Sequence, residues 1–184
     1  VEVYGKRIEL LKHAVPGLHR VGLMVSPNRP EYQRDTPWKR DLQGVARSQD
    51  TSLDFINFDT DTVESAMSAT VARGAQGLIY PSDGVAVARR QEIADSAIRY
   101  KLPTIFALRQ NVDAGGLMSY SARIADLSRR AAFFVDRILK GTKPNALPIE
   151  QPTTFELLIN LRTAKALGVT PTPNLLAIAD EVIE

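Results

Sequence analysis

Residues 77–108 read GLIYPSDGVAVARRQEIADSAIRYKLPTIFAL, and this stretch decides the fold class. Apolar runs at 77–80 and 103–108 stand at its two ends, both too short for helices and typical of buried strands. Between them, apolar residues recur at helical spacing over 85–100. A strand, a helix and a second strand in this order form a crossover connection, which places the two strands parallel in one sheet.

The same alternation extends in both directions along the chain. Short apolar runs and segments with apolar residues at helical spacing follow one another before and after this stretch. The further strands are predicted at 21–25, 53–58, 117–120 and 155–159, and the further helices at 5–15, 37–49, 63–74, 125–140, 161–167 and 173–183. The sequence therefore predicts an α/β fold with a doubly wound, mainly parallel sheet and helices on both of its faces.

The composition is that of a globular chain and excludes several classes of function. The 184 residues are 44% hydrophobic and 24% charged, and their net charge is +2. Such a small charge gives no strong attraction to nucleic acid or to an anionic membrane. Because the chain has no cysteine, disulfides, cysteine–zinc sites, iron–sulfur clusters and cysteine nucleophiles are excluded. No apolar run approaches the length that spans a bilayer.

The predicted topology indicates where a ligand would bind. In open parallel sheets, ligands bind beyond the carboxyl ends of the strands, where helix N-termini also point. The loops at these ends carry hydroxyl, amide, carboxylate and guanidinium groups and two aromatic rings. The candidate ligand-binding residues are Ser26, Asn28, Ser82, Asp83, Phe106, Arg109 and Tyr120. This set favours a small polar or zwitterionic ligand with a partly apolar body.

Most of these polar residues also have a purely structural interpretation. Ser82 and Asp83 are residue types that cap the N-terminus of a helix. Ser26 and Asn28 lie in a sequence typical of a simple turn. Arg109 is suited equally to holding a ligand carboxylate, to neutralising a helix C-terminus and to standing in solvent.

Catalytic and cofactor motifs are missing from the sequence. No nucleophile elbow, dinucleotide-binding loop or phosphate-binding loop follows a predicted strand, and no histidine and acidic pair has metal-ligand spacing. His13 and His19 flank the turn before the first predicted strand, away from the candidate site. Asp83 is the one carboxylate well placed for an α/β enzyme, and it lacks a histidine to activate. The sequence thus indicates binding rather than catalysis, with no cofactor and no metal.

Several segments match one known family in sequence and in order. They are GKRIELLK at 5–12, VPG at 15–17, AGGLMSY at 114–120, ILKG at 138–141, LPIEQP at 147–152, FELLINL at 155–161, AKALG at 164–168 and ADEVI at 179–183. Together they resemble the substrate-binding proteins of ABC transporters, in the subfamily that includes tryptophan- and tyrosine-type binders. The resemblance covers essentially the whole chain. It implies one lobe of a type I periplasmic-binding-protein fold, with the first lobe absent.

The resemblance also divides the chain into three parts. Residues 5–120 correspond to the ligand-binding second lobe, and 147–184 to a return strand and a helical tail. Residues 121–146 correspond to a hinge crossing and a helix that packs on the absent first lobe. The face of this helix that carries Leu127 and Phe134 is then covered by the first lobe or by a second copy of the chain.

The function implied by the resemblance is that of the substrate-binding component of an ABC importer. Such a protein captures a small organic solute, here an amino acid or a related carboxylate, and delivers it to ABC permease subunits. In this role Asp83 takes an ammonium group, Ser26 and Asn28 take a carboxylate, and no nucleic-acid partner is expected. The location is the periplasm or the outer cell surface, with a signal peptide and, as one option, a lipid anchor in the full-length protein.

An alternative of another class has the same fold. The effector-sensing domain of a transcription regulator would carry a DNA-binding headpiece before the present first residue, where an importer component would carry a signal peptide.

Overall fold

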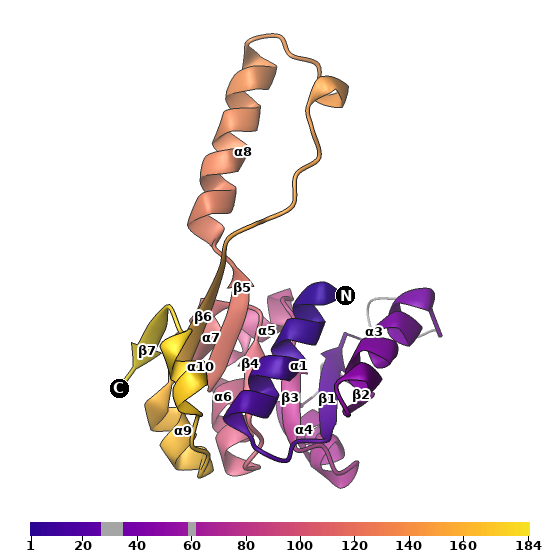
Figure 1. The fold of residues 1–184 in the computed structure, drawn as a ribbon, viewed down its shortest axis with the longest axis vertical. Helices are drawn as coiled ribbons and strands as arrows, with labels where there is room; N and C mark the ends of the chain where they lie inside the picture. Colours follow the sequence, from indigo (N-terminus) through magenta and orange to yellow (C-terminus); the bar gives the residue numbers. More distant parts are fainter. Residues whose placement is uncertain (27–34, 59–61) are drawn as a thin grey trace.

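The computed structural model describes residues 1–26, 35–58 and 62–184 (Figure 1). At the centre of these residues is a seven-stranded sheet with the order β2-β1-β3-β4-β5-β6-β7. The strands are β1 (Arg20–Val25), β2 (Ser52–Asn57), β3 (Gly77–Tyr80), β4 (Thr104–Phe106), β5 (Met118–Ala122), β6 (Phe155–Asn160) and β7 (Glu181–Ile183). Strands β1 to β5 are parallel, whereas β6 runs antiparallel to β5 and parallel to β7. The predicted mainly parallel sheet is confirmed.

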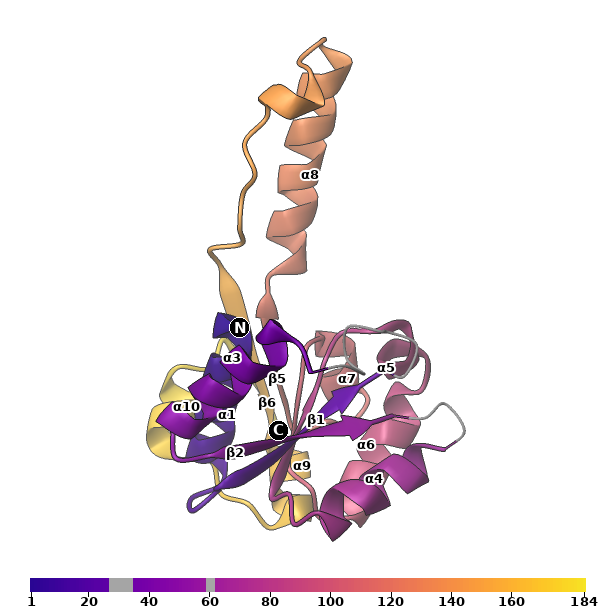
Figure 2. The same ribbon diagram turned by 90° about the vertical axis from the view of Figure 1, so that its right-hand side faces the viewer.

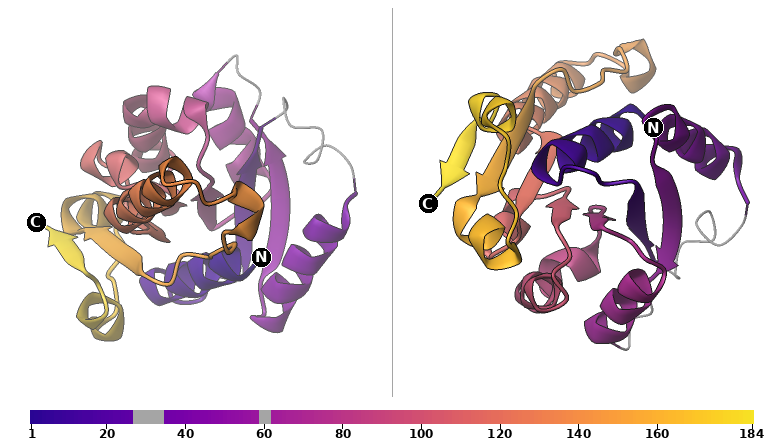
Figure 3. Two further views of the ribbon diagram at one scale, coloured as in Figure 1. Left: turned by 90° about the horizontal axis from the view of Figure 1, so that it is seen from above. Right: turned by 60° about the horizontal axis from the view of Figure 1, so that its bottom comes forward.

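Helices cover both faces of the sheet, as predicted (Figure 2). On one side lie α1 (Glu2–Ala14), α3 (Pro37–Ser48) and α10 (Pro173–Ala177). On the other side lie α4 (Val63–Ala72), α5 (Gly84–Ala88), α6 (Arg90–Arg99) and α7 (Arg109–Asp113). A further helix, α9 (Leu161–Leu167), follows β6 directly. Strands β2 and β7 form the two edges, so α3 and the C-terminus lie on opposite sides in both views of Figure 3.

Each face of the sheet has its own apolar core, because neighbouring residues of a strand point in opposite directions. In β1, Leu23 packs in the core beneath α1 and α3, whereas Met24 packs in the core beneath α4 and α6. In β3, Ile79 and Leu78 divide in the same way. Strands that are buried on both faces are continuous apolar runs, which is the pattern seen in the sequence.

Local signals place the helix starts where the sequence predicts them. The Thr36 hydroxyl accepts a hydrogen bond from the backbone N–H of Lys39, and Pro37 occupies the first helical position of α3. The Thr62 hydroxyl accepts one from the N–H of Ser65 at the start of α4. Such caps satisfy backbone donors that the first turn of a helix leaves unpaired.

Three predicted elements differ from the structure. The helix predicted at 85–100 is divided at Arg89, whose backbone (φ −106°, ψ 23°) ends α5 and precedes α6. The helix predicted at 173–183 ends at Ala177, and the last residues form β7 instead, with Glu181 paired to Leu158 of β6. Helix α7 lies at Arg109–Asp113, where the sequence predicts neither a helix nor a strand. For β7, the pairing with β6 outweighs the local apolar pattern.

A helical arm leaves the lobe between β5 and β6 (Figures 1 and 2). Helix α8 (Ile124–Leu139) rises away from the sheet, and residues 140–154 return beside it through a 3-10 turn, Pro144–Ala146. An Arg130–Glu150 ion pair links the helix to the returning segment. The whole of α8 is described, and none of its side chains is buried. The helix predicted at 125–140 is confirmed, with an uncovered apolar surface.

Gly116 provides a test of the packing between β4 and α7. A Cβ atom at this position would lie 2.5 Å from the ring of Phe106 and 2.7 Å from the backbone oxygen of Asn111. We expect Gly116→Ala to lower the free energy of unfolding by about 1–3 kcal/mol, measured by urea denaturation. A Cβ atom at Gly44 in α3 would meet open space, so Gly44→Ala is the control and should raise stability by roughly 0.5–1 kcal/mol. Equal effects of the two substitutions would contradict the close contact.

Candidate functional site

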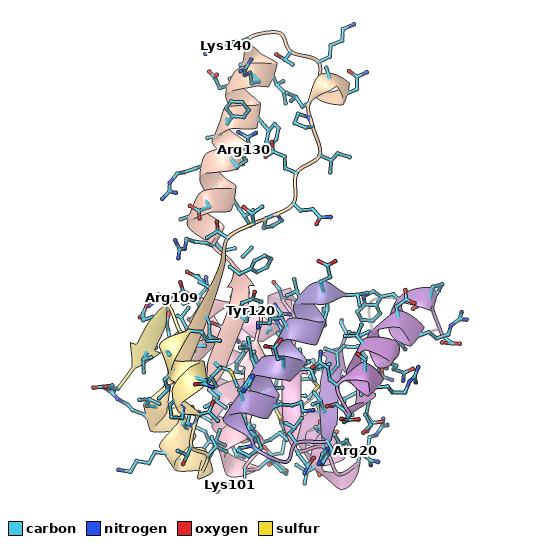
Figure 4. The ribbon with its side chains drawn as sticks, viewed as in Figure 1. Arg20, Lys101, Arg109, Tyr120, Arg130 and Lys140 are labelled. Atoms are coloured by element: carbon cyan, nitrogen blue, oxygen red, sulfur yellow. The ribbon has the colours of Figure 1, made fainter. Side chains whose placement is uncertain are left out.

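The candidate site lies at the end of the lobe from which the arm rises. The carboxyl ends of the parallel strands meet at this end, and α1 begins there (Figure 1). Tyr120 and Arg109 are found near this end, whereas Arg20 and Lys101 mark the opposite end (Figure 4). The topology thus brings the loops that follow β3, β4 and β5 together, as the crossover rule requires.

A hollow of about 410 Å³ is formed where these loops meet the start of α1 and the segment before β6. Its walls combine hydroxyl groups, one buried guanidinium, one carboxylate and apolar surface. The residues that define its character are Glu2, Arg7, Ser82, Leu108, Ser121 and Phe155. A mainly apolar hollow with a few converging polar groups is typical of a small-molecule site.

Arg7 is a functional candidate that the sequence did not single out. It is only 5% exposed, and its Nε and Nη2 atoms donate to the Tyr120 carbonyl oxygen at 3.1 Å and 2.8 Å. The guanidinium carbon also lies 5.3 Å from the ring centre of Tyr4. Burial lowers the pKa of Arg7. A signal was present, because Arg7 shares a helix face with the buried Leu11 and Ala14 at i+4 and i+7.

Ser82 and Ser26 follow β3 and β1 in the predicted positions. Ser82 is exposed and lines the hollow. Ser26 is half-buried and is not among the residues that line it. Asn28 lies outside the described residues. Of this hydroxyl and amide group, Ser82 is the residue that the structure places in the hollow, and it is joined there by Ser121.

Asp83 caps a helix in the structure. Its Oδ1 atom accepts a hydrogen bond of 2.6 Å from the backbone N–H of Ala86, at the start of α5. Asp83 is half-buried and is not among the residues that line the hollow. Asp83 therefore has the helix-capping role that its residue type suggests. In this arrangement its second carboxylate oxygen, Oδ2, is the atom available to a ligand.

Phe106 and Tyr120 have different surroundings. Phe106 is 1% exposed and stacks on Tyr80, with ring centres 6.1 Å apart, in the core beneath α4 and α6. Tyr120 is half-buried and stacks on Phe155 at 5.3 Å, at the base of the arm. Phe106 is thus a residue of the apolar core. Tyr120 contributes to the site through its carbonyl group, which contacts Arg7, and through its ring contact with Phe155.

Arg109 already holds a carboxylate of this chain. Its Nη1 and Nη2 atoms donate to the two oxygens of Glu181 at 2.6 Å and 2.7 Å, a bidentate pair. These hydrogen bonds raise the pKa of Arg109 and lower the pKa of Glu181. The pair joins α7 to β7. The sequence does not indicate it, because its apolar spacing predicts Glu181 in a helix rather than in an edge strand.

Side chains that ligate metals do not gather in the described part of the chain. Within 1–26, 35–58 and 62–184, no group of three histidine or acidic side chains is placed to hold a metal ion. His13 and His19 are exposed, and His19 adjoins Arg20 at the end of the lobe opposite the hollow (Figure 4). In the same described ranges, the helices are too short or too polar to cross a membrane.

Comparison with known proteins identifies the family. The family model described as ABC transporter substrate binding protein matches residues 1–183. The chain belongs to this family. The resemblance seen in the sequence is confirmed, and the family is one of binding proteins rather than an enzyme class.

Several solved structures share the fold of this chain. A conserved domain protein from Vibrio cholerae is 22% identical with a TM-score of 0.84, over 97% of this chain and 60% of its own. An ABC domain in complex with L-Trp from Streptococcus pneumonia is 21% identical with a TM-score of 0.85, over 98% and 60%. A substrate binding protein with adhesive properties from Clostridium difficile, in a ligand-free, open structure, is 20% identical with a TM-score of 0.69, over 96% and 58%.

The chain spans about 60% of the length of the first of these structures, and at these identities the likeness establishes the fold. No curated protein matches the chain. The periplasmic-binding-protein-like α/β fold expected from the sequence is confirmed.

The capping role of Asp83 in this ABC transporter substrate binding protein can be tested by substitution. We expect Asp83→Ala to lower the free energy of unfolding by about 1 kcal/mol, because α5 loses its cap. Asp83→Asn keeps a capping oxygen and should retain most of that stability. Thermal and urea denaturation measure the stability of both variants. The control is Ser82→Ala, because Ser82 is not the cap residue of α5, and its stability should stay within about 0.5 kcal/mol of the parent. A destabilisation by Asn as large as that by Ala would contradict the cap.

Proposed function

We propose that this chain is the second lobe of the substrate-binding component of an ABC importer and that the hollow is one side of its solute site. The family match carries the proposal. The solute class that the hollow fits is an amino acid or a related carboxylate, since cationic, hydroxyl and apolar groups line it together. The similar protein described in complex with L-Trp supports the same class. Ser26, Asn28, Ser82, Asp83, Phe106, Arg109 and Tyr120 stay candidate residues, with Ser82 the best placed.

The exposed apolar surface of the arm supports the proposal that another lobe packs against it. Leu127, Val135 and Leu139 on α8 are 39%, 54% and 81% exposed, although an apolar helix face normally packs against other structure. A hollow of about 490 Å³ lies between α8 and the returning segment, with Leu127 and Phe134 in its wall. The solved structures are longer than this chain by a part that it does not match. We propose that this additional part is a first lobe and that it packs on the apolar face of α8. The alternative is that a second copy of the chain packs there.

In this proposal residues 121–146, which include α8, form the predicted hinge crossing and the helix that packs on the first lobe. The segment predicted as the return, 147–184, rejoins the same sheet through β6 and β7. In the proposed role the two lobes close on a solute and present it to ABC permease subunits, in the periplasm or at the outer cell surface. The family match favours this role over the effector-sensing domain of a transcription regulator.

A thermal-shift screen of the full-length protein tests the solute class. The probes are the L-amino acids, aromatic carboxylates and, as the contrasting class, neutral sugars. We expect a member of the first two groups to raise the melting temperature, because a ligand at one hundred times its Kd adds about 2.7 kcal/mol to stability. The 184-residue chain alone should respond more weakly, since one lobe cannot enclose a solute. Stabilisation by sugars and by no carboxylate would overturn the proposed class.

Substitution on the arm tests the covering lobe. Leu127→Ser should change the stability of the 184-residue chain by no more than about 0.5 kcal/mol, because the side chain is already exposed. In the full-length protein the same change should cost about 1.5–3 kcal/mol, the contribution of a buried leucine. Arg129→Ser is the control, since Arg129 lies on the same helix with a side chain that is 76% exposed. Equal behaviour of Leu127→Ser in both proteins would show that no lobe covers this face.

If a second copy of the chain covers the arm instead of a first lobe, a different result is expected. If it covers the arm, the 184-residue chain sediments as a dimer, and Leu127→Ser converts it to a monomer.

A further inference from the structure

A buried cation in the hollow has no counter-charge. Arg7 is 5% exposed, and among the described residues no carboxylate lies within ion-pairing distance of its guanidinium. Glu2 also lines the hollow, but it is exposed and forms no ion pair with Arg7. Burying a charge without a partner of opposite sign costs free energy, and such charges are normally paired. The protein therefore keeps an uncompensated positive charge at the wall of the hollow.

The hydrogen bonds of Arg7 leave one edge of the guanidinium available. The Nε and Nη2 atoms both donate to the carbonyl oxygen of Tyr120, at 3.1 Å and 2.8 Å. This contact fixes the plane of the group and occupies its Nε–Nη2 edge. The Nη1–Nη2 edge has no acceptor among the described residues. Two parallel N–H groups on such an edge match the two oxygens of a carboxylate.

The rest of the hollow suits an anion that is attached to an apolar body. The exposed Ser82 and the buried Ser121 add hydroxyl groups beside Arg7, and Leu108 and Phe155 add apolar surface. Electrostatic attraction is stronger at a largely buried side chain such as Arg7 than in bulk water.

We propose that Arg7 binds the carboxylate group of the solute through the Nη1–Nη2 edge of its guanidinium. The proposal rests on the proposed function and deepens it, because it requires a solute with a free carboxylate and excludes neutral sugars and amines. It also moves carboxylate recognition from Ser26 and Asn28 in the loop after β1 to the first helix. Tyr120 is the positioning residue, since its carbonyl oxygen orients the guanidinium.

Paired probes test the proposal in the full-length protein. Each L-amino acid is compared with its own carboxamide, which has the same side chain and ammonium group but no carboxylate. We expect the acid to bind the wild-type protein about 10- to 100-fold more tightly than the amide, by isothermal titration calorimetry. In Arg7→Met this acid-to-amide ratio should fall to near one, while Arg7→Lys, which keeps the charge but loses the fork, should give an intermediate ratio.

The ratio separates recognition from a structural role. If Arg7 only holds the Tyr120 carbonyl, its replacement weakens acid and amide by the same factor and leaves the ratio unchanged, which overturns the proposal. Should Arg7→Met fail to fold, as judged by circular dichroism, the Arg7→Lys ratio decides in the same way. Equal binding of acid and amide by the wild type overturns the role of Arg7 and leaves the proposed function standing. A wild type that binds none of the acids overturns both.

Discussion

The crossover connection between parallel strands is the constraint on which this structure depends. Each connection from β1 to β5 must carry the chain back along the sheet, and the helices that do so bury both faces of the strands. The same constraint gathers the carboxyl ends of these strands at one edge. The loops at that edge do not have to fill the core and can carry polar groups, and the hollow forms there. The two exposed histidines lie at the opposite edge.

The change of direction at β6 gives the lobe its second feature. Because β5 and β6 are antiparallel neighbours, the chain between them must leave and return at the same point, and the arm is the result. Its base is well connected: the N–H of Arg123 donates to the Thr154 carbonyl at 3.1 Å, and its guanidinium lies 3.4 Å from Asp180. Tyr120 stacks on Phe155 beside these contacts. The base of the arm is thus held to the lobe by several contacts, whereas none of the side chains of α8 is buried.

Sequence reasoning succeeds where local signals decide the structure and fails where distant contacts do. Strand β3 and helix α9 lie at the residues predicted, since a short apolar run and a capped amphipathic turn are local properties. The apolar spacing of the last residues fits a helix, yet β7 exists through pairing with β6. The burial of Phe106 depends on which way a strand end faces, which its sequence does not determine. Arg7 is easily overlooked because a charged residue in an amphipathic helix usually stands in solvent.

Arg7 also connects the hollow to the base of the arm. Its guanidinium contacts the Tyr120 carbonyl, two residues before the end of β5 and four before the start of α8. A carboxylate at the free edge would offset the cost of burying the cation and raise the pKa of Arg7 from its lowered value. The carboxylate would also hold the guanidinium in the orientation in which it contacts the Tyr120 carbonyl. Solute capture and the rigidity of the arm's base would then be coupled through a single side chain, which gives a binding protein a direct reason to bury an unpaired arginine there.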